Sequence, residues 1–159
     1  MEITQNEEKE TLKYINDTPK FSKILGNDDL KKLLKRLGNP QDKTKFIHVA
    51  GTNGKGSVSN MLASVLSACG LKVGLYTSPH ILDFRERMRV VGDVSYCVSK
   101  EYVYDFVGRW QETFDHLDLS FFEITTIMAL QWFADEKVDA VVLETGLGGR
   151  LDSTNIVTP

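Results

Sequence analysis

The chain has 159 residues, of which 42% are hydrophobic, so it is long enough and apolar enough to form one domain with a buried core. A net charge of −3 argues against nucleic acid as a partner, and no apolar run is long enough to cross a membrane. Cys69 and Cys97 match no metal-binding pattern, so we interpret them as free thiols, buried or half-buried. The first residues lack the layout of a secretion signal, and we expect a cytoplasmic protein.

Residues 1–45 are predicted to form a helical lead-in of two short helices. The residues 27–29 can cap the second helix, and leucines follow at helical spacing. These leucines are Leu30, Leu33, Leu34 and Leu37. The segment 38–40 (GNP) ends this helix, because glycine tolerates the left-handed conformation and proline cannot continue a helix. A polar connector, residues 41–45, then leads into the first strand.

A strand, a helix and a second strand are predicted within residues 46–76. The first strand is 46–50, and the helix follows a glycine-rich turn and ends at Gly70. One face of this helix is apolar and carries Val58, Met61, Leu62, Val65 and Leu66. Two strands joined by a helix are expected to lie parallel, so the second strand, 72–76, should run in the same direction as the first.

The second half of the chain continues the alternation of helix and strand. A small β excursion is predicted at 90–95, and two helices and a buried apolar strand, 139–145, follow it. The inward-facing positions of the two helices are Val103, Phe106, Val107, Trp110 and Phe114 in one, and Ile124, Ile127 and Met128 in the other, which begins at Ser120. This order predicts an α/β domain of three layers with a mainly parallel sheet. Three convincing strands are few for such a domain, so we expect it to be truncated.

The glycine-rich turn, residues 50–57 (AGTNGKGS), lies between a buried strand and a helix. Its glycines allow backbone N–H groups to converge, the helix N-terminus favours an anion, and Lys55 can reach phosphate oxygens. The turn departs from the common pattern G-x-x-x-x-G-K-[ST], since Val49 takes the first glycine position and Gly56 follows the lysine. The alternative is a structural turn with an incidental lysine. The order of strand, turn and helix favours a polyphosphate site.

Several segments resemble, in the correct order, the signatures of the folylpolyglutamate synthase/dihydrofolate synthase family, a branch of the Mur ligase superfamily. They are 38–40 (GNP), 51–57 (GTNGKGS), 76–80 (YTSPH) with 84–89 (FRERMR), 121–123 (FFE) and 144–155 (ETGLGGRLDSTN). The resemblance covers about residues 12–159 and implies a P-loop, Mur-ligase-like ATPase domain. It also implies a ligase that uses ATP to phosphorylate a carboxylate of a folate, after which the amine of L-glutamate displaces the phosphate. Dihydropteroate is an open second substrate.

The resemblance assigns roles to individual residues. Lys55 is implied as the catalytic cation, and the ATP-binding residues are Thr52, Asn53, Gly54, Lys55, Gly56 and Ser57. The implied Mg²⁺ ligands are Ser78 and Glu144, which lie at the carboxyl ends of predicted parallel strands, and Ser57 is a competing hydroxyl. The residues implied to bind the folate or pteroate are Phe122, Glu123, Leu151, Asp152 and Ser153.

Some of these side chains also have structural interpretations. Glu123 completes a capping box with Ser120, which alone would explain its presence. His80 is interpreted as a loop histidine that is solvent-facing or hydrogen-bonded. The alternating arginines Arg85, Arg87 and Arg89 would share one face of an extended segment. They would there meet phosphate or folate carboxylates, or form a solvated edge. Trp110 and Trp132 are interpreted as core residues.

Members of the family continue well beyond the last residue of this sequence. We therefore expect residues 1–159 to be the N-terminal part of the ATP-binding domain, without the C-terminal glutamate-binding domain. Such a chain should be inactive alone, and the full-length protein is expected to be a monomer. Two other functions remain open. One is a Mur-type ligase acting on another carboxylate, and the other is a non-catalytic module that binds ATP.

Overall fold

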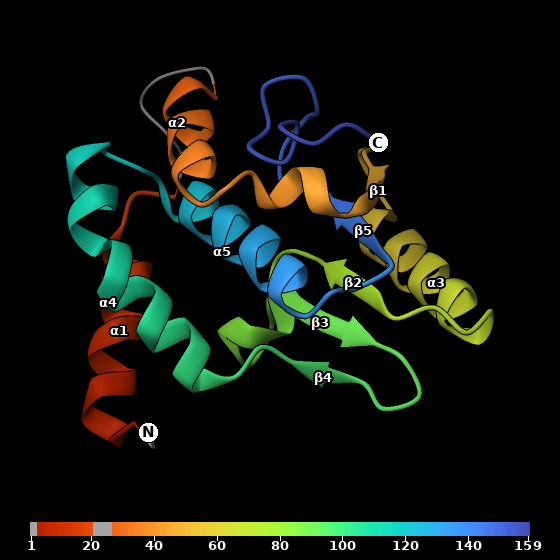
Figure 1. Cartoon of the computed structure of the whole chain (residues 1–159), viewed down its shortest axis with the longest axis horizontal. Coiled ribbons are helices and arrows are strands. Elements are labelled where there is room, and N and C mark those ends of the chain that lie inside the picture. The colour runs from red at the N-terminus through yellow and green to blue at the C-terminus, as the bar shows by residue number, and fades with distance from the viewer. Residues whose placement is uncertain (1–2, 21–26) are drawn as a thin grey trace.

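The computed structural model describes residues 3–20 and 27–159 and contains, within them, a five-stranded sheet in the order β1-β5-β2-β3-β4 (Figure 1). Three strands run parallel: β1 (Lys45–Val49), β5 (Ala140–Glu144) and β2 (Val73–Tyr76). β5 lies between β1 and β2, so the predicted strand–helix–strand unit has parallel strands that are not neighbours. The predicted β excursion is an antiparallel hairpin of β3 (Met88–Val91) and β4 (Tyr96–Cys97), which extends the sheet.

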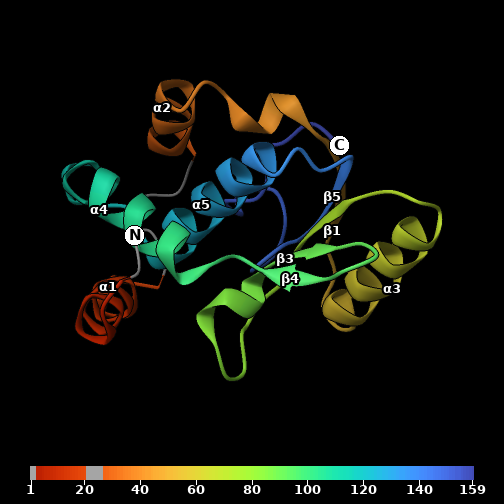
Figure 2. The same cartoon turned by 60° about the horizontal axis from the view of Figure 1, so that its bottom comes forward.

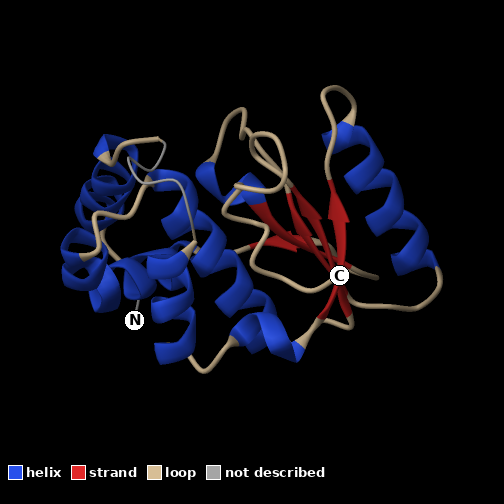
Figure 3. Ribbon diagram, turned by 90° about the horizontal axis from the view of Figure 1, so that it is seen from above, coloured by secondary structure: helices blue, strands red, loops and turns tan. Residues whose placement is uncertain are grey.

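Helices cover both faces of the sheet, which gives the predicted three-layer α/β architecture (Figure 3). On one face, α5 (Phe121–Asp135) packs against α2 (Asp28–Arg36) and α4 (Lys100–His116), and α1 (Gln5–Asp17) packs against α4. On the other face lies α3 (Lys55–Ala68) (Figure 2). None of the helices in the described part of the chain combines the length and the apolarity that a bilayer crossing requires.

The strands separate two hydrophobic cores because their side chains alternate between the faces. In β5, Val141 and Leu143 belong to the larger core on the α5 side, whereas Val142 belongs to a smaller core under α3. Gly74 of β2 permits the close approach of α5, since a Cβ at this position would lie 2.7 Å from Cδ1 of Phe133. The sheet and α5 therefore pack more tightly here than any larger residue would allow.

The apolar face predicted for α3 is more exposed than a core face. Val58, Met61 and Val65 are 46%, 67% and 62% exposed, whereas Leu62 and Leu66 are partly buried against the sheet. The apolar stripe is wider than the part of α3 that contacts the strands.

The two cysteines are free thiols. Cys69, just after α3, is exposed, not buried or half-buried as expected, and Cys97 is half-buried.

The two helices α1 and α2 lie within residues 1–45, of which residues 1–2 and 21–26 lie outside the described residues. Asn27 occupies the N-cap position of α2, but its side chain donates to the carbonyl oxygen of Asp152 at 3.2 Å instead of capping the helix. Gly38 and Asn39 take positive φ angles of 80° and 50°, as a helix stop requires. The predicted polar connector forms a 3₁₀ turn, η1 (Pro40–Lys43).

Candidate functional site

The glycine-rich turn joins β1 to α3 as predicted. Gly54 lies directly before α3 with a φ of 78°, a left-handed conformation that favours glycine. Thr52, Asn53 and Gly54 are exposed, so the first N–H groups of α3 open to solvent. The Nζ atom of Lys55 donates to the carbonyl oxygen of Gly51 at 2.9 Å, which holds the lysine across the turn. The turn has the open N–H groups and the cation that a phosphate group needs.

Glu144 connects this turn to the ends of two parallel strands. It is buried at the end of β5, and its Oε2 atom accepts a hydrogen bond from the backbone N–H of Ser78 at 3.0 Å. A Cβ on Gly56, in the first turn of α3, would lie 3.7 Å from both carboxylate oxygens. Glycine at this position therefore gives the carboxylate room beside α3. The structure brings Ser78, Glu144 and the turn together at the carboxyl ends of the strands, where parallel sheets bind ligands.

The oxygen atoms at this point fit a hard divalent cation. The oxygen ligands available are the Glu144 carboxylate and the hydroxyl of the neighbouring Ser78, with the Ser57 hydroxyl of α3 as the alternative, and Mg²⁺ prefers such oxygen ligands. Within the residues that the structure describes, no group of three His, Cys, Asp or Glu side chains forms a ready-made metal cage. A Mg²⁺ ion here would complete its shell with phosphate oxygens and water, as it does in other phosphate-binding proteins.

A cavity of about 1000 Å³ lies beside Ser78. All five residues predicted to bind the folate or pteroate line it: Phe122, Glu123, Leu151, Asp152 and Ser153. Its walls also include Asn16, Lys20 and Asn27 from the helical lead-in, together with His80 and Arg87. Sequence reasoning missed the three lead-in residues, because nothing in their local pattern indicates that these helices reach the cavity.

Two predicted ligand residues are hydrogen-bonded within the protein. The carboxylate of Asp152 accepts from the backbone N–H groups of Gly146, Leu147 and Thr154, at 3.0, 2.8 and 2.9 Å, and from the Thr154 hydroxyl. The carboxylate of Glu123 accepts from the N–H and hydroxyl of Ser120, which confirms the predicted capping box. Both side chains line the cavity while their internal bonds fix its walls.

Phe122 forms an apolar wall of the cavity because Gly146 lets it approach the loop after β5. A Cβ at Gly146 would lie 2.5 Å from Cζ of Phe122, so a larger residue would push the ring away. The ring also packs against Tyr76, with 6.0 Å between the ring centroids. Phe122 therefore connects the end of β2, the start of α5 and the loop after β5 in one contact.

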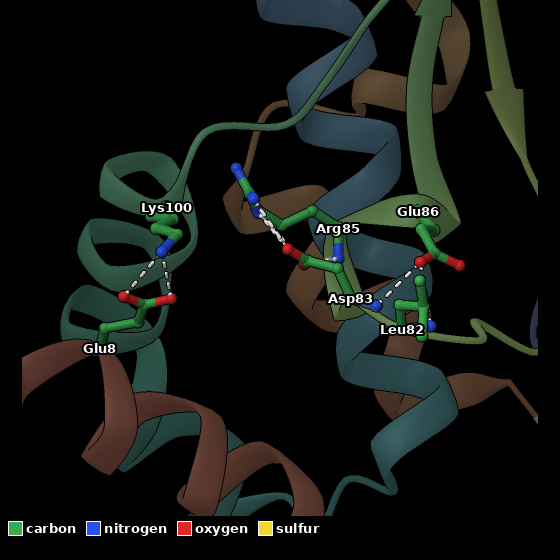
Figure 4. A network of polar contacts seen from close by, with 6 residues as sticks. All are labelled: Glu8, Leu82, Asp83, Arg85, Glu86 and Lys100. Atoms are coloured by element: carbon green, nitrogen blue, oxygen red, sulfur yellow. Dashed lines mark hydrogen bonds and ion pairs between the residues drawn. The ribbon is translucent and has the colours of Figure 1, made fainter. Parts of the chain in front are cut away.

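The three alternating arginines do not share a face, which corrects the expectation. Arg85 and Arg87 lie in a 3₁₀ turn, η2 (Phe84–Arg87), and Arg89 lies on β3. Arg85 pairs with Asp83 (Figure 4), and Arg89 donates to the side-chain oxygen of Asn60 at 2.8 Å. Arg87 is buried and lines the cavity. A 3₁₀ turn repeats about every three residues, so side chains two apart diverge.

His48 on β1 connects to the cavity wall through a chain of hydrogen bonds. Its Nε2 atom lies 2.8 Å from the hydroxyl of Thr154, and that hydroxyl donates to Asp152. Burial lowers the pKa of His48, and the nearby Asp152 charge opposes this shift. The neutral imidazole can then donate from Nε2 to Thr154. Sequence reasoning missed this contact, which joins residues far apart in the chain.

Two curated relatives match nearly the whole chain. A folylpolyglutamate synthase from Lacticaseibacillus casei is 40% identical over 154 residues, which are 94% of this chain and 36% of the relative. A dihydrofolate synthase/folylpolyglutamate synthase from Bacillus subtilis is 42% identical over 153 residues, which are 92% of this chain and 35% of the relative. The chain therefore spans about a third of the length of these relatives. No protein-family model matches it.

Solved structures agree with the fold. The folylpolyglutamate synthase of Thermotoga maritima superposes with a TM-score of 0.85 at 42% identity, over 96% of this chain and 36% of that one. A folylpolyglutamate synthase complex with AMPPCP and folate gives a TM-score of 0.85 at 39% identity, over 96% and 38%. A bifunctional folylpolyglutamate synthase/dihydrofolate synthase with Mn, AMPPNP and L-glutamate bound gives 0.80 at 40% identity, over 92% and 34%.

Proposed function

We propose, because this chain corresponds to the N-terminal portion of folylpolyglutamate synthase/dihydrofolate synthase proteins, that it forms the ATP- and acid-binding part of a folate–glutamate ligase. The ligase transfers the γ-phosphoryl group of ATP to a folate carboxylate and leaves ADP. The amine of L-glutamate then attacks the acyl carbon, which forms the amide bond and releases phosphate. The name of the Bacillus subtilis relative includes dihydrofolate synthase, so dihydropteroate is a second acid to test. Residues 1–159 are the first part of the ATP-binding domain and are inactive without a C-terminal, glutamate-binding domain. The full-length protein works as a cytoplasmic monomer.

The convergence of Glu144, Ser78 and the glycine-rich turn carries this proposal. Phosphoryl transfer asks the protein mainly to position the phosphates and to stabilise the charge that develops on them. The catalytic Lys55 and the N–H groups of residues 52–57 hold the ATP phosphates. Ser78 and Glu144 hold Mg²⁺, with Ser57 as the alternative hydroxyl ligand. The ion supplies positive charge beside the transferred phosphoryl group.

The cavity beside Ser78 receives the acid substrate. Its apolar wall at Phe122 suits a flat aromatic ring, and Leu151 adds apolar surface at the rim. Glu123, Asp152 and Ser153 offer polar edges beside this wall. The related complex that contains both AMPPCP and folate supports a nucleotide and an acid as the two ligands. The volume of about 1000 Å³ is at the large end of the range for small-molecule sites.

The test is a ligase assay on the full-length gene product with MgATP, L-glutamate and a reduced folate, or with dihydropteroate. Mass spectrometry should show the acid gaining one glutamate, and the chain of residues 1–159 alone should give no product. A full-length protein that hydrolyses or binds ATP without ligating glutamate would contradict the proposal.

The site itself is tested by nucleotide binding. Glu144→Gln keeps an acceptor for the Ser78 N–H but removes the charge, and it should weaken Mg²⁺-dependent ATP binding by about tenfold or more, which is about 1.4 kcal/mol. Glu136→Gln is the matched control, because Glu136 pairs with Lys72 and does not line the cavity. Equal effects of the two changes would remove Glu144 from the metal site.

A further inference from the structure

Arg87 is a buried cation that the proposed ATP and metal sites do not use. It ends the 3₁₀ turn η2, is 7% exposed, and lines the cavity together with Ser78 and His80. Its backbone carbonyl accepts a hydrogen bond from the N–H of Thr77 at 3.1 Å, so its position is tied to the segment that carries Ser78. The guanidinium therefore belongs to the end of the cavity that adjoins the proposed phosphate site.

The guanidinium has few partners within the protein. Its Nε atom donates to Nδ1 of His80 at 2.8 Å, and its carbon lies 4.9 Å from the centroid of the Phe121 ring. Across residues 3–20 and 27–159, no carboxylate forms an ion pair with Arg87. Arginine has five N–H donors, so four of them are without a protein acceptor in the part of the chain that the structure describes.

A buried cation without an anion is costly, so its presence in a cavity wall indicates that a ligand supplies the anion. Burial lowers the pKa of Arg87, and the charge of Glu144 acts in the opposite direction. In the described part of the chain, Glu144 forms no ion pair with Arg87. The N–H groups of Arg87 that have no protein acceptor can bind a carboxylate, which accepts two parallel hydrogen bonds from a guanidinium.

His80 sets the orientation of this guanidinium. Because Nδ1 accepts a hydrogen bond from Arg87, the neutral imidazole carries its proton on Nε2. The ring packs against the edge of Phe84, with 6.1 Å between centroids. Because this bond occupies Nε, the N–H groups on the two terminal nitrogen atoms of Arg87 are the ones left for a ligand.

We propose that Arg87 binds the carboxylate of the acid substrate that is to be phosphorylated, and that His80 is the positioning residue for Arg87. This proposal rests on the proposed function and names the group that recognises the reacting end of the acid. Arg87 and Ser78 line the same cavity, so a hydrogen bond from Arg87 would hold the substrate carboxylate next to the γ-phosphate of ATP. A charged acid is then recognised at this end of the cavity, while the apolar wall at Phe122 contacts its ring.

The experiment measures binding of a reduced folate and of its γ-carboxamide to the full-length gene product. The two ligands differ only at the end that would be phosphorylated. The unmodified protein should prefer the acid by about 30-fold, and Arg87→Gln should reduce this preference to within about threefold. Arg87→Lys keeps the charge but loses the paired donors, so it should retain part of the preference. His80→Ala should also reduce the preference, with a smaller effect than Arg87→Gln.

Arg85→Gln is the matched control, because Arg85 belongs to the same 3₁₀ turn but pairs with Asp83 and does not line this cavity (Figure 4). It should leave the acid preference unchanged. An unchanged preference in a folded Arg87→Gln protein would overturn the proposal, and a loss of ATP affinity alone would assign Arg87 to the nucleotide instead. Failure of the unmodified protein to bind either folate ligand would overturn the proposed function itself.

Discussion

On one face of the sheet, α5 lies beneath further helices, and the side chains between them form the larger hydrophobic core. On the other face, α3 lies over a small core and keeps Val58, Met61 and Val65 exposed. The larger core holds the ends of α5 and β2, from which the cavity wall is built. The glycine-rich turn leads into α3, on the face with the smaller core. The larger core and the turn proposed to bind phosphate therefore lie on opposite faces of one sheet.

The strongest test of this comparison is a pair of truncations. Phe133→Ala removes a fully buried ring from the larger core and should lower the free energy of unfolding by about 3–5 kcal/mol. Val65→Ala removes exposed atoms from α3 and should change it by less than about 0.5 kcal/mol. Urea denaturation of the chain measures both. Similar losses would show that the two faces contribute equally.

Gly74→Ala tests how tightly α5 packs on the sheet. The new Cβ would meet the buried ring of Phe133, so unfolding should become easier by about 1–3 kcal/mol. Gly108→Ala is the control, because no atom outside its own helix lies within 4 Å of the new Cβ on α4. That change should stabilise the chain by up to about 1 kcal/mol, since alanine favours a helix. A neutral Gly74→Ala would mean that α5 can shift without cost.

Ser120→Ala tests the capping box at the start of α5. It removes two bonds with Glu123 and should lower stability by about 1 kcal/mol. Ser99→Ala at the more exposed start of α4 removes one bond to the N–H of Tyr102 and should cost less. Thermal unfolding of both variants checks the order. The reverse order would show that the exposed cap of α4 contributes more to stability than the buried cap of α5.

The smallest expected effect is a pH dependence at the edge of the sheet. Burial lowers the pKa of His48 in the folded chain, although Asp152 opposes the shift. The unfolded histidine titrates near pH 6.5, so the unfolded state takes up its proton first as the pH falls. The stabilisation is present above about pH 6.5 and is lost below it. Denaturation at several pH values should show a shallower fall for His48→Gln, and an identical slope would contradict this assignment.

Much of the fold follows from local pattern. The leucines of α2, the apolar strand β5 and the capping box of α5 are all read correctly from spacing. The order β1-β5-β2 could not be read in this way, because it depends on which strands meet after the chain has folded. The exposure of α3 also escaped prediction, since periodicity identifies an apolar face but not what covers it.

In the candidate site, too, residues within motifs were predicted and contacts that depend on folding were not. The glycine-rich turn, Ser78 and Glu144 are identified by motif, and the structure brings them together. That Arg87 lacks a carboxylate partner could not be predicted. The partners of its neighbours Arg85 and Arg89 depend on the turn η2 and on packing with α3, which the sequence pattern does not show. Whether a charged side chain has a counter-ion is a property of the folded molecule.

The bonds made by Asp152 have a consequence for how this domain can diversify. One carboxylate ties both ends of the loop after β5, from Gly146 and Leu147 to Thr154. The residues between Leu147 and Asp152 include Leu151, which is exposed and contributes little to either core. We expect this stretch to tolerate substitution without loss of the fold. Its sequence could be randomised to seek altered ligand preference, provided that the aspartate and the flanking glycine stay in place.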